Sequence, residues 1–105
     1  MEAVSIDTSL RALADENRRT ILSLVKDGPL SVGDIAEQVD VTQQAVSHHL
    51  GVLKKAGLVE ESRDGTRHLF AVRTDGFAAV RSYLDDFWPT QLAALKKAVE
   101  DAANG

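Results

Sequence analysis

The sequence predicts one mostly α-helical domain with a β-hairpin, its elements following the order α-α-α-α-β-β-α. Three observations support this prediction. Apolar residues recur at helical spacing through most of the chain, and after Gly57 the spacing changes to that of strands. An Asp-Gly pair then separates two short runs of strand-forming residues. Because 105 residues amount to about one domain, we expect residues 1–105 to share a single core.

Composition excludes several classes of protein. The chain is 44% apolar and 27% charged, which is typical of a soluble globular protein. It has no apolar run long enough for a transmembrane helix, and Met1-Glu2-Ala3 does not resemble the start of a signal peptide. The absence of cysteine excludes disulfides, thiolate metal sites and a cysteine nucleophile.

The first two predicted helices are marked by capping residues and a Gly-Pro stop. Asp7 or Thr8 is expected to cap the first helix, and Asp15 the second. Both segments carry leucines at the spacing of an apolar helix face. Gly28-Pro29 then ends the second helix, because proline cannot continue it.

The next two predicted helices form a helix-turn-helix. Residues 31–34, Ser-Val-Gly-Asp, are a capping box with Asp in place of the usual Glu, and they open a short helix. After a tight turn at Asp40-Val41, Thr42 caps a longer helix that extends to about Gly57. Two short helices joined by a turn of about three to four residues are the outline of this motif.

Two strand-like runs, Leu58–Ser62 and Arg67–Val72, follow these helices. The segment between them, Arg63-Asp64-Gly65-Thr66, contains the Asp-Gly pair that is typical of a tight hairpin turn. Helices, then a hairpin, then one more helix are arranged as in a winged helix-turn-helix, with the hairpin as the wing.

The last predicted helix covers about residues 75–103 and is capped by Thr74 or Asp75. Its apolar residues lie on one stripe. Because Pro89 lies inside this segment, we expect a kink or a break near Phe87.

The net charge of −4 is unevenly distributed along the chain. Residues 1–40 carry a net −4, residues 41–73 a net +2, and residues 74–105 a net −2. All three histidines also lie in the basic middle segment. This segment coincides with the longer helix and the wing, although a charge cluster alone is also typical of a solvated surface.

The helix over residues 42–57 is predicted to have two different sides. Val46, Leu50 and Leu53 fall within a narrow arc and are expected to face the core. The opposite side carries Gln44, Ser47, His48, Gly51, Lys54 and Lys55. Glutamine, serine and histidine can contact base edges in the major groove, and lysine neutralises phosphate, so this side suits DNA binding. The helix alone fits an ordinary amphipathic surface helix equally well, and it is the preceding short helix and the basic hairpin that favour DNA binding.

Arginines flank the predicted hairpin turn. Arg63 and Arg67 are expected at the tip of the wing, where arginine commonly enters a narrow minor groove. A hairpin tip also needs polar residues for solubility alone. Glu60 and Glu61 are expected to point away from DNA or to pair with nearby cations.

Four segments of the chain resemble the ArsR/SmtB family of dimeric bacterial winged-helix repressors: Ala12–Arg18, Val41–Leu50, Val52–Val59 and Arg63–Gly65. The resemblance covers roughly residues 8–100. It implies that helix 42–57 enters the major groove, that the hairpin touches flanking DNA, and that the first and last helices build the dimer.

The resemblance also implies DNA contacts at particular positions. Residues 42–44, 47 and 48 match the DNA-contacting positions of the family, whereas His49 is expected to be structural or to contact phosphate. Together with the side chains singled out above, the expected DNA-binding residues are Thr42, Gln43, Gln44, Ser47, His48, Lys54, Arg63 and Arg67.

The metal-binding residues of this family are not found in the chain. Ser31 and Gly33 stand at the positions of two thiolate ligands. A second arrangement of ligands on the last helix would begin at Asp85, but Phe87, Ala98 and Asp101 occupy its other positions. We therefore expect no metal site and no cofactor, with a carboxylate-only site left open.

A dimer is also expected from the amount of apolar surface on the last helix, which is more than a monomer of this size readily covers. Residues up to about Leu84 are expected to pack inward, and later ones to meet the partner. The expected dimer contacts, with the first helix included from the resemblance, are Leu10, Leu13, Phe87, Trp88, Leu92 and Leu95.

The sequence thus predicts a DNA-binding transcriptional regulator, foremost a homodimeric repressor that binds an inverted-repeat operator in double-stranded DNA through helix 42–57 and wing 58–72. The alternatives are a metal-responsive repressor with a carboxylate or histidine site, and a winged helix used for protein contacts. No phosphate-binding glycine loop or nucleophile–base motif indicates an enzyme. We expect a cytoplasmic location, on the nucleoid when DNA is bound, no membrane, and an effector, if one exists, that the sequence does not name.

Overall fold

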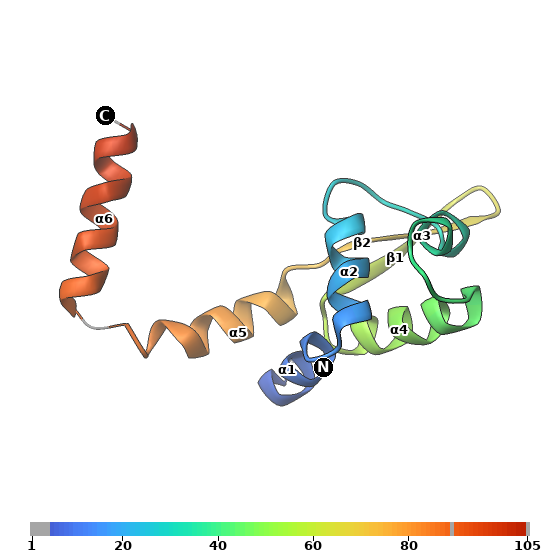
Figure 1. Ribbon diagram of the computed structural model, residues 1–105, viewed down its shortest axis with the longest axis horizontal. Helices are drawn as coiled ribbons and strands as arrows, with labels where there is room; N and C mark the ends of the chain where they lie inside the picture. Colours follow the sequence, from blue (N-terminus) through green and yellow to red (C-terminus); the bar gives the residue numbers. More distant parts are fainter. Residues whose placement is uncertain (1–4, 89, 105) are drawn as a thin grey trace.

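The computed structural model describes residues 5–88 and 90–104. It contains a winged helix-turn-helix body, from which the C-terminal helices lead away (Figure 1). The elements are α1 (Ile6–Leu13), α2 (Glu16–Val25), α3 (Val32–Gln38), α4 (Gln43–Lys55), β1 (Val59–Asp64), β2 (Arg67–Val72), α5 (Asp75–Asp85) and α6 (Thr90–Asn104). The mostly helical fold with one hairpin is the predicted one. No helix in the described part of the chain is both long and apolar enough to cross a membrane.

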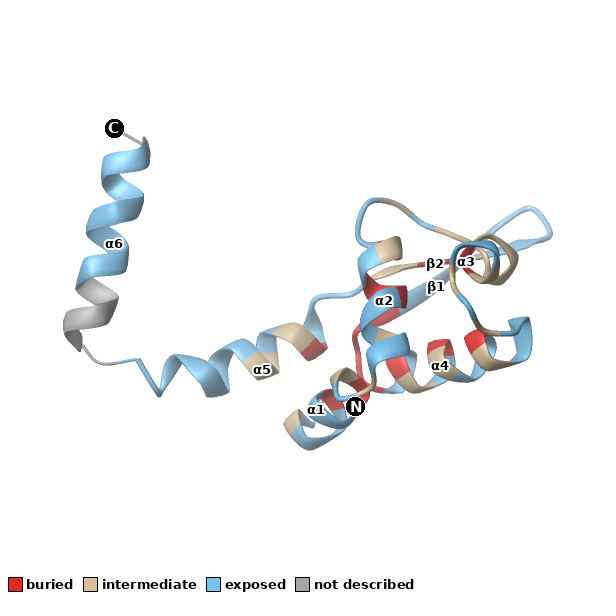
Figure 2. Cartoon of the chain, in the orientation of Figure 1, coloured by how far each residue is buried: buried red, intermediate tan, exposed pale blue. Residues whose placement is uncertain are grey.

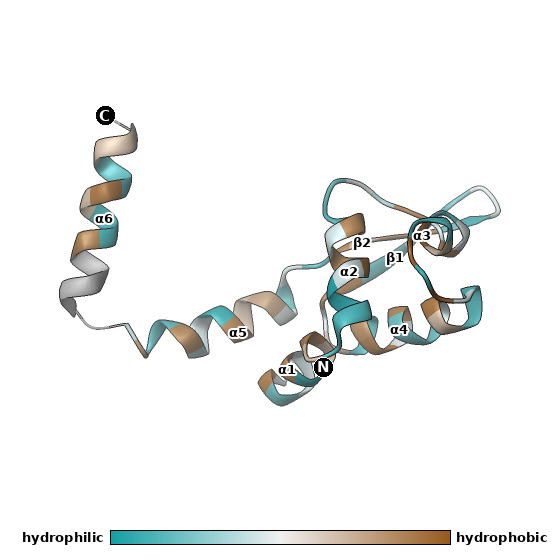
Figure 3. Ribbon diagram, viewed as in Figure 1, coloured by the Kyte–Doolittle hydropathy of each residue, from teal (hydrophilic) through white to brown (hydrophobic). Residues whose placement is uncertain are grey.

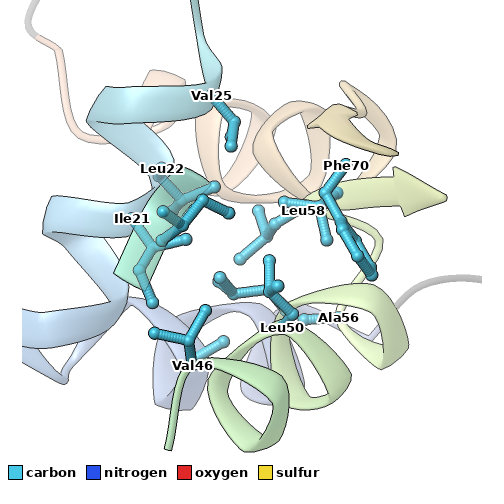
Figure 4. Packing of buried hydrophobic residues seen from close by; sticks show 12 residues of the cluster. Ile21, Leu22, Val25, Val46, Leu50, Ala56, Leu58 and Phe70 are labelled. Atoms are coloured by element: carbon cyan, nitrogen blue, oxygen red, sulfur yellow. The ribbon is translucent and has the colours of Figure 1, made fainter. Parts of the chain in front are cut away.

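One apolar core lies between helices α1 to α4 and the hairpin (Figure 2). Its side chains converge from both helices of the helix-turn-helix, from α2 and from the strands (Figure 4). The buried apolar residues are Ala12, Ile21, Leu22, Val25, Ile35, Val46, Leu50, Leu53, Ala56, Leu58, Val59 and Phe70. In Figure 3 the helices of this body carry apolar and polar residues on different sides, as amphipathic packing requires.

The helix starts in the body are set by side-chain caps, mostly where the sequence predicted them. The carboxylate of Asp15 accepts from the Arg18 backbone N–H (3.1 Å), and the Thr42 hydroxyl accepts from the Ala45 N–H (3.1 Å). The predicted capping box of α3 is present in both directions between Ser31 and Asp34. For α1 the prediction of Asp7 or Thr8 was wrong. The helix begins earlier, after Ser5, whose carbonyl accepts the Ser9 N–H at 3.1 Å.

The wing is a two-stranded antiparallel hairpin, in which Val59 lies opposite Val72 and Asp64 opposite Arg67. Its first strand extends to Asp64, two residues further than predicted, and Gly65 makes the turn with φ +66°. The hairpin is attached to the body through the middle of β2, by a bridge between Phe70 and Leu30 with N–H···O distances of 2.8 and 3.0 Å. Because Phe70 is also buried, this part of the wing is held by the core.

The last predicted helix is divided into two helices, α5 and α6, which places the expected break after Asp85. Pro89 itself lies outside the described residues. Thr74 is at the N-cap of α5 but makes no side-chain cap bond. Leu84 was predicted to pack inward, and this was wrong. Its side chain is 47% exposed, because α5 leaves the body after its first turns and only Phe77 of the larger side chains packs against the core.

The first turn of α5 is attached closely to the body at Gly76. Its N–H donates to the carbonyl of Gly57 (2.9 Å), and the residue is buried against the turn between α4 and β1. A Cβ atom at Gly76 would overlap the carbonyl oxygen of Ala56 and lie 2.8 Å from Cδ2 of Leu58. Only glycine allows this close approach of α5 to the body.

We predict opposite effects for two glycine-to-alanine substitutions. Gly76→Ala forces backbone apart and should lower the free energy of unfolding by about 1–3 kcal/mol. Gly51→Ala, in the middle of α4 with no atom within 4 Å of the added Cβ, should raise it by up to about 1 kcal/mol through helix propensity. Urea unfolding at equal protein concentration checks both, and equal effects of the two substitutions would contradict the packing described here.

The stabilisation supplied by Asp34 should depend on pH. Hydrogen bonds from Ser31, followed by the charge of Arg67, hold the pKa of Asp34 below its usual value. Its contribution is therefore complete above the ordinary carboxyl pKa of about 3.9 and is lost as the pH falls through the lower folded value. Asp34→Ala should reduce stability at neutral pH and lose this effect in acid, whereas Glu37→Ala, at an exposed position of the same helix, should show no such pH dependence. Urea titrations across this range measure the difference.

Candidate nucleic-acid interface

The two sides of α4 are as different as the sequence predicted. Val46, Leu50 and Leu53 are at most 1% exposed and contribute to the core. The opposite side is solvent-exposed from one end of the helix to the other. It presents Gln43, Gln44, Ser47, His48, Gly51, Lys54 and Lys55, with the exposed cap Thr42 in front of them.

The N-terminal end of α4 and the tip of the wing lie at the same end of the molecule, opposite α5 and α6 (Figure 1). The backbone N–H groups in the first turn of a helix lack intrahelical acceptors, and with the helix dipole they attract phosphate. Thr42 accepts the N–H of Ala45, so this first turn is fixed. The end of the body that carries the exposed glutamines thus also offers an anion-binding helix terminus.

The arginines of the wing lie on opposite faces of the hairpin. Arg63 is directly opposite His68, and its Nη2 lies 3.4 Å from the Nε2 of that ring. Arg67 is opposite Asp64, one register position further along, and therefore projects from the other face. Both side chains are exposed near the turn, as predicted, but they do not meet each other.

Two of the predicted DNA-contacting cations already hold a carboxylate. Nζ of Lys54 lies 3.1 Å from Oε1 of Glu61, and Nη2 of Arg67 lies 2.9 Å from Oδ2 of Asp34. The expectation that Glu61 pairs with a nearby cation is therefore confirmed. No ion pair involves Lys55 or Arg63 within the part of the chain that the structure describes.

Glu61 is held from two directions, which keeps it ionised. Its Oε2 lies 2.7 Å from Nδ1 of His68 on the neighbouring strand, while Oε1 faces Lys54. These hydrogen bonds, that of Lys54 first, hold the pKa of Glu61 below its usual value. The basic surface of α4 and the wing thus contains a negative charge at its centre.

His49 lies at the edge of the core, as its place in the helix predicted. It is half-buried, and its Nδ1 lies 3.5 Å from Nη1 of Arg18. Arg18 also donates to the carbonyls of Ala12 (2.7 Å) and Arg11 (2.9 Å), so it connects the end of α1 with α4. From the sequence, Arg18 was identified only as the last residue of the segment Ala12–Arg18, which resembles the family. No local signal in the sequence shows that its side chain spans two helices.

The predicted dimer residues occupy several different environments. Phe87, Trp88 and Leu95 are more than half exposed, and Leu10 is 41% exposed. Leu13 is partly buried and packs against the core of its own chain. Leu92 is in α6, but its side chain lies outside the described residues.

An open hollow of about 550 Å³ runs along the exposed side of α5. Phe77, Val80, Leu84 and Trp88 contribute its apolar lining. Tyr83 and Phe87 also pack edge to face, with ring centroids 5.0 Å apart, on the exposed part of the chain. Phe77 also packs against the core, whereas Tyr83, Leu84, Phe87 and Trp88 form an apolar surface that the body does not cover.

Within residues 5–88 and 90–104, no three His, Asp or Glu side chains lie close enough to hold a metal ion. Ser31, at one of the two positions where the resemblance implies a thiolate ligand, accepts the Asp34 N–H at 3.1 Å and thus caps α3.

Comparison with known proteins connects this arrangement to a family. Residues 15–61, from the cap of α2 into β1, match the family described as bacterial regulatory protein, arsR family. The HTH-type transcriptional regulator Rv2034 of Mycobacterium tuberculosis is 41% identical over 96 residues, which cover 91% of this chain and 90% of the relative. The transcriptional repressor SdpR of Bacillus subtilis is 38% identical over 64 residues, covering 61% of this chain and 71% of that protein.

The chain is also similar in structure to a solved winged helix-turn-helix domain. The homodimeric winged helix-turn-helix DNA-binding domain of Mb0332 from Mycobacterium bovis superposes with a TM-score of 0.63 at 30% identity, over 91% of this chain and 78% of that one. The similarity extends over the body and the C-terminal region alike, beyond the segment that matches the family. The fold, the exposed polar side of α4 and these similarities show that the chain belongs to the ArsR family and is a DNA-binding transcriptional regulator.

Proposed function

We propose that this protein is a homodimeric transcriptional repressor that binds an inverted-repeat operator. The observation that carries the proposal is the exposed polar side of α4, which lies opposite the buried stripe and meets the wing through the Lys54–Glu61 contact. Its side chains are hydrogen-bonding groups rather than apolar ones, which favours DNA over a protein partner for this surface. Repression is the activity named for the related SdpR, and it fits a protein whose two functions are dimerisation and DNA binding.

We assign base contacts to the exposed side chains in the first half of α4. The amide oxygen and nitrogen of Gln44 can each form a hydrogen bond with adenine. Ser47 and His48 project from the same side of α4, about one turn further along the helix. Thr42 and Gln43, at the helix start, would hold a phosphate together with the backbone amides. Lys54 would neutralise phosphate further along, and Arg63 and Arg67 would contact DNA beside the half-site.

We assign dimerisation to the exposed apolar side chains of α5, α6 and α1. Apolar side chains as exposed as Phe87, Trp88 and Leu95 are costly to leave in water, and a second copy of the chain would cover them. The homodimeric state of the related Mb0332 domain supports this assignment. Two-fold symmetry then places the half-sites one helical turn of DNA apart, about 10 bp, or a multiple of it.

The proposal also concerns the location of the protein, catalysis and an effector. A repressor of this kind acts in the cytoplasm, on the nucleoid when it is bound. No catalytic role is assigned to any residue. An effector that releases the operator is compatible with the proposal but is not required by it, because the amount of protein alone can control occupancy.

Base recognition by α4 is tested with the double substitution Gln44→Ala/Ser47→Ala. Operator DNA would be selected from random duplexes with the wild-type protein, and binding measured by fluorescence anisotropy on operator and shuffled DNA. We expect the pair of substitutions to weaken operator binding by roughly 10- to 100-fold, with little effect on shuffled DNA. The control Thr20→Ala/Ser23→Ala changes exposed side chains of α2 and should alter neither. Operator binding equal to that of wild type would refute the assignment.

The dimer surface is tested by placing a glutamate on α6 at two positions. Leu95→Glu should produce a monomer of 11.3 kDa, because the charge would be buried in the interface. Lys97→Glu changes the net charge by −2, more than the −1 of Leu95→Glu, but at a polar position of the same helix, and it should leave a dimer. Sedimentation equilibrium measures the mass, and operator binding should fall with dimerisation. A Leu95→Glu protein that remains dimeric would contradict the proposed interface.

A further inference from the structure

We propose that Glu61 is a specificity-determining residue, because its carboxylate holds Lys54 of α4 and His68 of the wing and so opposes binding to DNA of arbitrary sequence. The inference rests on the proposed DNA-binding function and deepens it. Glu61 is not among the residues assigned to DNA contact, and its negative charge repels phosphate.

The geometry makes Glu61 a connection between three elements. One carboxylate oxygen lies 3.1 Å from Nζ of Lys54 on α4, and the other lies 2.7 Å from Nδ1 of His68 on β2. The Nε2 of the same imidazole lies 3.4 Å from Arg63, so the chain of contacts continues to the tip of the wing. The Glu61 side chain is only 28% exposed, whereas those of Lys54 and His68 are about half exposed. The carboxylate is therefore less exposed than the two side chains that it contacts.

The first consequence is electrostatic and acts on all DNA sequences. Contacts with phosphate supply essentially all of the affinity for non-operator DNA. A phosphate that approaches Lys54 must compete with the carboxylate that this lysine already holds, and it is repelled by the same charge. Glu61 thus lowers the affinity for non-operator DNA, with which the protein makes only phosphate contacts.

The second consequence is geometric and acts only on the operator. There the base contacts of α4 fix the helix in the groove, so the wing must meet the flanking DNA at one angle. The link from Lys54 through Glu61 to His68 holds the wing to α4 at such an angle before binding. On the operator, the electrostatic cost of Glu61 is therefore partly offset, whereas on other DNA it is not.

The test compares Glu61→Gln with Glu60→Gln. Both remove one negative charge from β1. Glu60 is exposed on the opposite face of the hairpin, facing away from Lys54 because side chains alternate along a strand. Kd would be measured by anisotropy on the selected operator and on shuffled DNA of equal length, from about 50 to 200 mM salt, with circular dichroism as a check of folding.

For Glu61→Gln we expect shuffled DNA to bind roughly three- to tenfold more tightly, operator DNA to gain less, and the ratio of the two affinities to fall. The dependence of log Kd on log salt should steepen by about 0.9 for each protomer that gains a phosphate contact. Glu60→Gln should show a smaller change and keep the ratio. In a Lys54→Gln background the effect of Glu61→Gln should shrink, because the lysine it releases is absent.

Three results would overturn the inference: equal effects of the two glutamate substitutions, equal gains on operator and shuffled DNA, or an undiminished effect without Lys54. If the wild-type protein selects no operator, the proposed function fails as well. If it selects one but any of these three results is found, only the role of Glu61 fails.

Discussion

The structure depends on the burial of one side of α4. Val46, Leu50 and Leu53 are buried, and α4 packs against α1, α2, α3 and β1, which leaves a single side of the helix in solvent. The same packing that stabilises the body therefore orients the polar residues assigned to DNA. The exposed side needs no stabilising role of its own, so its composition is free to serve recognition. A substitution in the buried stripe would disturb both stability and the direction of the DNA-contacting side chains.

The wing is positioned by two kinds of contact. Buried Phe70 and its backbone hydrogen bonds to Leu30 hold β2 to the body, and these contacts are insensitive to salt. The exposed ion pairs, Arg67 with Asp34 near the tip and Glu61 with Lys54 at the level of Phe70, are weak individually and are screened by salt. Phosphate competes for the same cations. The wing is thus fixed to the body through β2, and DNA competes only for its ion pairs.

The net charge of −4 is compatible with DNA binding because of where the charges lie. The N-terminal and C-terminal parts are acidic, and the basic segment coincides with α4 and the wing. The acidic remainder repels phosphate, which makes binding through the basic surface alone weak and sensitive to salt. Glu61 places the same kind of opposition within the interface itself, so that affinity depends more strongly on base contacts than on charge.

The local features were predictable from the sequence: the caps at Asp15 and Thr42, the Asp-Gly turn of the wing, and the two sides of α4. Each depends on residues close together in the chain, so spacing alone predicts it. Which charges meet depends on how the helices and the hairpin pack together. The partners of Arg67 and His49 lie 33 and 31 residues away, and no pattern of spacing indicates such pairs. The exposure of Leu84 could not be predicted from the sequence either, because the same apolar stripe on a helix can pack against the core of its own chain or against a second chain.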